Sequence, residues 1–167
     1  MMDDIVVADL SNLVQGLLKV NLGNFKDKRG ENVELYDSAK FKEFFPKVST
    51  VSLSRSKKNV LRGFHGDLDN WKAVKPNVGV IQLFAFDARK DSPTYEKWAK
   101  FDLSATENCW IVIPPGVVNA HLAMTDCEFL YLLSEGYSPP ENQIHIKWDA
   151  YDFPWFTRQV ILSDRDK

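Results

Sequence analysis

The chain has 167 residues, of which 21 are Lys or Arg and 23 are Asp or Glu, so its formal net charge at pH 7 is −2. This balance, with a pI near 5.9, argues against nucleic acid as the main partner, because such domains usually carry a basic stripe. No apolar run approaches the roughly 20 residues that a membrane span needs, and the acidic start Met1–Asp4 lacks the basic segment of a signal peptide. We therefore expect one cytoplasmic domain over residues 1–167, with no nucleic-acid or membrane partner. The two cysteines are too few for a disulfide framework.

Short runs rich in Val, Ile, Phe and Trp, each bounded by turn residues, predict strands along most of the chain. In chain order, the predicted strands are residues 14–20, 78–86, 109–113 and 128–133. One short helix is predicted between the first two. Asp37 or Ser38 caps this helix, Phe41, Phe44 and Phe45 recur on its apolar face, and Pro46 ends it. Many short strands without a repeat or linker predict an all-β sandwich or barrel, with a jelly roll of the cupin type among the choices.

The densest group of polar residues between apolar runs is residues 54–67, and small β-barrels bind ligands at their mouths or interiors. His65 is the best candidate for acid–base chemistry, because imidazole titrates near neutral pH. The alternative is a histidine whose ring nitrogens are satisfied in the core or at the surface. Arg62 and His65 have opposite strand parity, so a kink at Gly63 would be needed to bring both to one ligand.

A metal site is a second hypothesis for a cupin, because His65, Asp67 and His121 offer two imidazoles and a carboxylate. A His-x-His pair is absent, however, since Asp67 occupies its second position, and we expect no metal. Four basic residues near turns are candidates to clamp a phosphate, with ordinary surface charge as the alternative: Arg29, Arg62, Lys72 and Arg89. The residues alone predict a β-rich domain with a small-molecule pocket.

A further set of motifs runs in order along nearly the whole chain. These are Phe25–Gly30 with Glu34, Arg62–His65, Lys72, Asp87–Thr94, Leu103–Ser104, Ile113–Gly116, Glu128–Tyr131, Tyr137–Pro139, Trp148 and Leu162–Asp166. In this order they resemble the dTDP-4-dehydrorhamnose 3,5-epimerase family. The resemblance implies a cupin jelly roll with one or two short helices and without metal or organic cofactor. It also implies a homodimer with exchanged N-terminal strands, and a role in surface-polysaccharide sugar biosynthesis, for capsular polysaccharide or lipopolysaccharide.

The same resemblance implies the roles of individual residues in an epimerase of nucleotide-diphospho-4-keto sugars. His65 is the base that removes the proton next to the ketone, Asp166 orients it, and Tyr131 returns a proton from the opposite face. Lys72, with Arg62 nearby, is the partner of the enolate oxygen. The substrate-binding residues implied in this way are Arg29 and Glu34 from the partner subunit, together with Arg62, Lys72, Asn119, His121 and Tyr137.

Three departures from the family pattern bear on the substrate. Thr50–Ser52 replaces a Gln-x-Asn motif, Val117–Leu122 replaces Phe-Ala-His-Gly-Phe, and Leu83 stands where the family has an acidic residue. His121 lies two positions beyond the family's histidine, so strand alternation returns it to the same face. The His-Gly-Asp and Asn-Ala-His segments resemble epimerases of capsule heptose biosynthesis, which implies a GDP-linked 4-keto-heptose as an alternative to a dTDP-4-keto-hexose.

Two other functions stay open at this point. The first is a sugar-nucleotide 3,4-ketoisomerase, which moves the carbonyl instead of inverting a carbon. The second is a catalytically silent protein that binds sugar nucleotides. The sequence also leaves open whether an epimerase of this kind would invert C3 alone or both C3 and C5.

Overall fold

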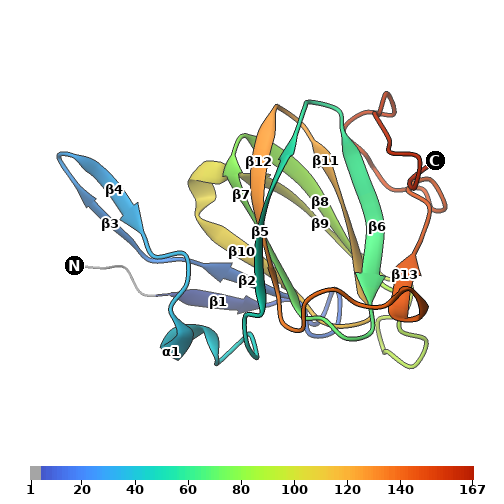
Figure 1. Cartoon of the computed structure of the whole chain (residues 1–167), viewed down its shortest axis with the longest axis horizontal. Helices are drawn as coiled ribbons and strands as arrows, with labels where there is room; N and C mark the ends of the chain where they lie inside the picture. Colours follow the sequence, from blue (N-terminus) through green and yellow to red (C-terminus); the bar gives the residue numbers. More distant parts are fainter. Residues whose placement is uncertain (1–4) are drawn as a thin grey trace.

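The computed structural model describes residues 5–167 as two facing antiparallel β-sheets with a β-hairpin that projects to one side (Figure 1). Met1–Asp4, the acidic start from which we predicted no signal peptide, lies outside the described residues. The first sheet has the strand order β1 (Val6–Asp9), β2 (Leu18–Asn21), β10 (Cys109–Ile113), β7 (Lys72–Val78), β12 (Cys127–Leu133) and β5 (Thr50–Ser56). The second sheet has the order β13 (Gln143–His145), β6 (Leu61–Asp67), β11 (Val117–Ala123), β8 (Val80–Asp87) and β9 (Trp98–Ser104). The hairpin consists of β3 (Asn24–Asp27) and β4 (Gly30–Val33), and the prediction of an all-β jelly roll is confirmed.

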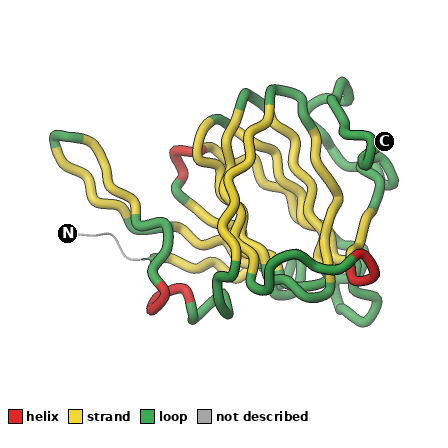
Figure 2. Tube along the Cα trace, in the orientation of Figure 1, coloured by secondary structure: helices red, strands yellow, loops and turns green. Residues whose placement is uncertain are grey.

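Helical structure is sparse, as Figure 2 shows. Among residues 5–167 there is one α-helix, α1 (Ser38–Phe41), and two single 3₁₀ turns, η1 (Ala105–Glu107) and η2 (Pro140–Asn142). The predicted start of the helix is confirmed, because the Asp37 side chain accepts a hydrogen bond from the backbone N–H of Ala39 at 2.8 Å. The predicted end at Pro46 is wrong, because α1 ends at Phe41 and the chain continues in turns. Its Phe41 ring is buried against Trp110 of β10, which anchors the helix to the outer face of the first sheet.

Two of the four predicted strands agree closely with the structure. Residues 109–113 form β10, and β12 begins one residue before the predicted 128–133. The other two predictions are wrong at their first residues, because each apolar run crosses a glycine turn. Gly16, with φ of +83°, precedes β2, and Gly79, with φ of +80°, separates β7 from β8. The apolar run does not reveal the bend, because residues on both sides of it are apolar.

Apolar clusters occupy both faces of the second sheet. The core between the two sheets includes Val74, Leu83, Ile111 and Phe129. The core on the outer face of the second sheet joins Phe64, Phe84 and Phe86 of the sheet to Phe153 and Trp155 of the C-terminal segment. This burial holds the segment on the sheet, and the backbone N–H of Leu61 donates to the carbonyl of Ile161 at 3.0 Å. The end of the chain therefore returns to β6.

Strand β6 has one extra residue, relative to its partner β11, between Arg62 and His65. His65 lies opposite Asn119 and Arg62 lies opposite His121, so three steps along β6 match two along β11. The extra residue reverses the strand alternation, and both Arg62 and His65 line the same cavity. The kink predicted at Gly63 is confirmed.

We expect Gly63→Ala to lower the free energy of unfolding by at least about 2 kcal/mol. Gly63 has φ of +111°, and an added Cβ would lie 2.5 Å from the carbonyl oxygen of Asn119. Gly30→Ala is the matched control, because Gly30 has φ of +129° but no atom within 4 Å of an added Cβ. Denaturant titration measures both variants, and equal losses would contradict a steric role for the approach to β11.

Candidate active site

A cavity of about 310 Å³ opens between the two sheets. Six residues predicted for the site line it: Arg62, His65, Lys72, Asn119, His121 and Tyr131. Ser52, Ser54 and Leu133 complete the lining. The members from β6 and β11 belong to the second sheet and those from β5, β7 and β12 to the first, so a ligand here is contacted from two opposite walls.

His65 lies beside the C-terminal carboxylate that was predicted to orient it. Its Nε2 is 2.7 Å from Oδ1 of Asp166, whose residue is only 3% exposed. Oγ of Ser163 donates to the other oxygen, Oδ2, at 2.8 Å. Burial lowers the pKa of His65, and the Asp166 carboxylate opposes part of this shift. The imidazole is therefore neutral at pH 7 and able to accept a proton.

A third residue, His145, joins this pair and was missed by the sequence analysis. β13 places His145 opposite His65, with the ring centroids 5.1 Å apart. Its Nε2 is 3.8 Å from Oδ1 of Asp166. The one signal that marks it in the sequence is that the chain has only three histidines. The pairing of β13 with β6 joins segments far apart in the sequence and leaves no local pattern.

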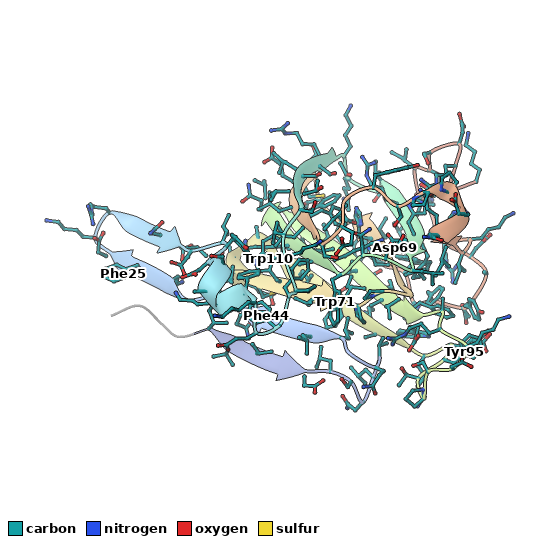
Figure 3. All side chains as sticks on the ribbon, turned by 60° about the horizontal axis from the view of Figure 1, so that its bottom comes forward. Phe25, Phe44, Asp69, Trp71, Tyr95 and Trp110 are labelled. Atoms are coloured by element: carbon teal, nitrogen blue, oxygen red, sulfur yellow. The ribbon has the colours of Figure 1, made fainter. Side chains whose placement is uncertain are left out.

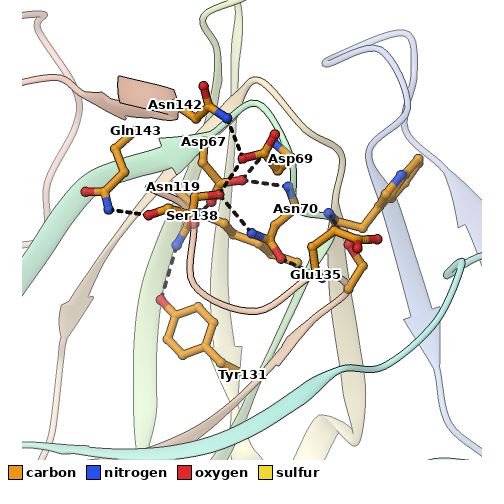
Figure 4. A network of polar contacts seen from close by, with 12 residues as sticks. Asp67, Asp69, Asn70, Asn119, Tyr131, Glu135, Ser138, Asn142 and Gln143 are labelled. Atoms are coloured by element: carbon orange, nitrogen blue, oxygen red, sulfur yellow. Dashed lines mark hydrogen bonds and ion pairs between the residues drawn. The ribbon is translucent and has the colours of Figure 1, made fainter. Parts of the chain in front are cut away.

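Tyr131 reaches the cavity from the first sheet and meets two polar residues of β11. Nδ2 of Asn119 donates to its hydroxyl at 3.3 Å (Figure 4), and the hydroxyl is 3.3 Å from Nδ1 of His121. Burial raises the pKa of Tyr131 to about 12, so the phenol keeps its proton at neutral pH. Burial, together with the nearby charge of Arg62, lowers the pKa of His121 to about 3, so this ring is neutral. The prediction that His121 faces the pocket is confirmed.

Lys72 is held in the cavity by Asp67. Its Nζ is 3.1 Å from Oδ2 of Asp67, and the backbone N–H of Asn70 donates to Oδ1 at 2.6 Å, within the polar network of Figure 4. Burial lowers the pKa of Lys72, which the Asp67 carboxylate counters. The grouping of Asp67 with His65 and His121 as metal ligands is therefore wrong, because Asp67 pairs with Lys72. Within residues 5–167, the ligand-type side chains that do converge are those of His65, His145 and Asp166.

Arg62 lies at the exposed end of the cavity with neutral partners. Its Nε donates to Oγ of Ser56 at 3.1 Å, and its Nη2 donates to the carbonyl of Arg55 at 3.3 Å. Neither partner carries an opposite charge, so the guanidinium is available to an anion at the cavity mouth. Arg89, the other arginine considered as a phosphate clamp, pairs instead with buried Asp87 and does not line the cavity.

Three predicted substrate-binding residues lie outside the cavity. Arg29 is at the turn of the β3–β4 hairpin and pairs with Asp27, while Glu34 follows β4 and pairs with Lys40. The hairpin extends away from the sheets, with Phe25 far from the labelled aromatic residues of the body (Figure 3). Tyr137 is 83% exposed. The structure of one chain therefore does not bring Arg29, Glu34 or Tyr137 to the cavity.

None of the helices described within residues 5–167 has the length and apolar character to span a membrane. The family model described as dTDP-4-dehydrorhamnose 3,5-epimerase matches residues 11–167. The enzyme of that name from Salmonella typhimurium is 35% identical over 152 residues, covering 85% of this chain and 82% of the relative.

Two solved structures are also similar to the chain over nearly its full length. The dTDP-4-dehydrorhamnose 3,5-epimerase from Sulfolobus tokodaii has a TM-score of 0.87 and 29% identity, covering 97% of this chain and 92% of that one. A 3,5-epimerase from Legionella pneumophila in complex with dTDP-4-keto-L-rhamnose has a TM-score of 0.83 and 26% identity, covering 99% of this chain and 90% of that one. The agreement of the sequence motifs, the jelly roll and these matches has one consequence: the chain belongs to the dTDP-4-dehydrorhamnose 3,5-epimerase family of sugar-nucleotide epimerases.

Proposed function

We propose that the protein inverts C3 and C5 of a nucleotide-diphospho-4-keto-6-deoxy sugar by moving the protons next to the ketone. The observation that carries this proposal is a neutral imidazole, His65 beside Asp166, in one cavity with the protonated phenol of Tyr131. The two groups come from opposite sheets. Inversion needs this arrangement, because a proton leaves one face of the sugar ring and another arrives on the opposite face.

The proposed proton transfers follow from the contacts of each group. Nε2 of His65 faces Asp166, so Nδ1 is the nitrogen that takes the substrate proton. The buried carboxylate then stabilises the imidazolium. Proton removal moves negative charge onto the C4 oxygen, where Lys72 and Arg62 supply positive charge. Tyr131 returns a proton from the other wall.

The nucleotide diphosphate binds, in this proposal, between Arg62 and residues of a second protomer. Arg29 and Glu34 lie on or just beyond a hairpin that extends away from the two sheets (Figure 1). This supports a homodimer with exchanged N-terminal strands, in which the hairpin of one protomer reaches the cavity of its partner. Tyr137, which is exposed, packs against the base. A single domain over residues 1–167, a cytoplasmic location and a role in surface-polysaccharide biosynthesis stay predictions.

Two substrates are consistent with the proposal. The names of the relatives and the Legionella complex support a dTDP-linked hexose. The altered motifs support a GDP-linked 4-keto-heptose, because Ser52 and His121, which belong to those motifs, line the cavity itself.

Proton NMR in deuterated water, with GDP-4-keto-heptose and dTDP-4-keto-hexose offered separately, tests the proposal. We expect deuterium at C3 and C5 of one of them, together with new epimers. Deuterium at C3 alone would show that the enzyme inverts only that carbon. A product whose carbonyl has moved from C4 to C3 would indicate a ketoisomerase. Absence of exchange with both sugars would contradict catalysis of this reaction and favour a silent binding protein.

We expect Tyr131→Phe to lower the rate of inversion by roughly 10²–10⁴-fold, the range for loss of a general acid. Deuterium exchange at C3 with retained configuration continues in this variant, because His65 can return a proton to the face from which it came. NMR in deuterated water separates the two processes. Tyr151→Phe is the matched control, since Tyr151 packs with Phe86 and Phe153 outside the cavity. Equal inversion by Tyr131→Phe and the wild type would contradict the role of Tyr131.

A further inference from the structure

Beyond the proposed reaction, one group of side chains around the base has the composition of a metal-binding site. One ring nitrogen each of His65 and His145 and one carboxylate oxygen of Asp166 all lie within 4.8 Å of one another. They come from β6, β13 and the C-terminal tail. Two imidazoles and one carboxylate are a common donor set for Zn²⁺ and similar divalent ions.

We propose that His65, His145 and Asp166 bind one Zn²⁺ ion per chain, and that this ion inhibits the enzyme by occupying the side chain of its base. The binding is independent of the function proposed above, whereas the inhibition rests on it.

The distances suit a small divalent ion. Tetrahedral Zn²⁺ holds nitrogen and oxygen ligands at about 2.0–2.2 Å, which places two such ligands roughly 3.4 Å apart. The distance from Asp166 Oδ1 is 2.7 Å to His65 Nε2 and 3.8 Å to His145 Nε2. The distance to His65 is shorter, and the distance to His145 longer, than the separation of two ligands of one Zn²⁺ ion. Rotation of the two imidazoles therefore accommodates the ion without movement of the strands.

The buried carboxylate points at this position without a satisfied hydrogen bond. Oδ1 of Asp166 and Nε2 of His65 are both buried and lack a hydrogen-bond partner of suitable geometry, although they lie close together. Oδ2 accepts from Ser163, which fixes the orientation of the carboxylate as outer partners of metal ligands do. A buried oxygen with an unused lone pair is costly in free energy, and a cation between the three groups removes that cost.

The rings of His65 and His145 form the exposed side of the site. Their side chains are 31% and 34% exposed, so rotation of these rings lets the ion reach the buried atoms Nε2 of His65 and Oδ1 of Asp166 and retain a water molecule as its fourth ligand. One positive charge lies near the site, that of Arg165, which acts on His65 and whose Nη2 donates to Oε1 of Gln143 at 2.9 Å. The carboxylate of Asp166 offsets this charge.

Inhibition follows from the identity of the ligand atom. Zn²⁺ on Nε2 of His65 takes the lone pair of that nitrogen and comes between the ring and the Asp166 carboxylate. The single proton of the neutral ring then lies on Nδ1, so Nδ1 has no lone pair with which to accept the substrate proton. Chelation of the ion restores the free base.

Direct binding measurements test the site without reference to activity. Tag-free protein, first stripped with EDTA, is titrated with Zn²⁺ in competition with a chromophoric chelator, and with Co²⁺ for its visible absorption spectrum. We expect one ion per chain and a tetrahedral Co²⁺ spectrum. His145→Gln should weaken binding by more than roughly 100-fold, since even partners outside the coordination sphere contribute about 10–100-fold to affinity. Glu141→Gln, which removes an exposed carboxylate from the adjacent turn, is the matched control and should bind as the wild type does.

Activity assays then test the inhibition. Compared with its own metal-free rate, the His145→Gln variant should keep its activity at Zn²⁺ concentrations that inhibit the wild type. Failure to bind one ion, or equal affinity of wild type and His145→Gln, would overturn the site. Binding that leaves wild-type turnover unchanged would overturn the inhibition. If the metal-free enzyme turns over neither sugar, the proposed function fails, and the binding titration still decides the metal site.

Discussion

His65→Asn is expected to lower kcat for epimerisation by roughly 10²–10⁴-fold, the contribution typical of a general base. The amide of Asn is polar and fits the same space, but it does not accept a proton from carbon at neutral pH. Deuterium exchange at both C3 and C5 should fall together, because in our proposal one base serves both positions. NMR in deuterated water, with thermal unfolding to check the fold, measures this.

His145→Gln in metal-free buffer is the matched control for His65→Asn, because it removes the neighbouring imidazole and leaves His65 beside Asp166. It should retain the wild-type rate. Survival of exchange in His65→Asn would show that another group removes the proton.

Removal of the last five residues, 163–167, is expected to lower kcat by up to roughly 10⁴-fold, the loss found when the orienting carboxylate of a Ser-His-Asp triad is replaced. The deletion removes Asp166 and its partner Ser163 but leaves Leu162, which packs on the outer core. The hydrogen bonds that join Ile161 to Asn59 and Leu61 also remain, so the fold is retained. Steady-state kinetics and thermal unfolding separate the two effects.

The single substitution Asp166→Asn tests the same role without shortening the chain, and its pH profile gives a second measurement. Burial lowers the pKa of His65 and the Asp166 carboxylate raises it. Since the neutral ring is the active form, the wild type loses activity only as the pH falls below the ordinary histidine value of about 6.5. Without the carboxylate, the pKa falls further, and the acid limb of kcat/KM moves to lower pH. Asp164→Asn, a change to an exposed residue of the same tail that pairs with Lys167, is the control. An acid limb that stays in place would contradict the contact between Asp166 and His65.

Some features followed from the sequence because their causes are local. The cap at Asp37 and the spacing of the phenylalanines predicted α1, and the apolar run of residues 109–113 predicted β10. The parity of Arg62 and His65 showed that a kink at Gly63 was needed before both could face one ligand, and the bulge is present. The order of short motifs along the chain was sufficient to identify the family.

Other features depend on strand pairing between distant segments, which local patterns do not encode. Apolar clusters lie on both faces of the second sheet and of the central strands of the first. Alternation alone therefore does not indicate which strands pair or where an apolar run bends, as residues 14–20 and 78–86 show. His145 entered the site only because β13 pairs with β6.

By itself, the sequence determined the all-β class, the short helix, the family and six residues that line the cavity. Only the tertiary structure decided that Asp67 holds Lys72, that Asp166 contacts two histidines, and that Arg29 lies at the turn of a hairpin and does not line the cavity of its own chain. The physical reason is that short-range patterns set helix caps and strand propensity. The packing of the C-terminal segment on the outer face of the second sheet, in contrast, brings together residues about a hundred positions apart.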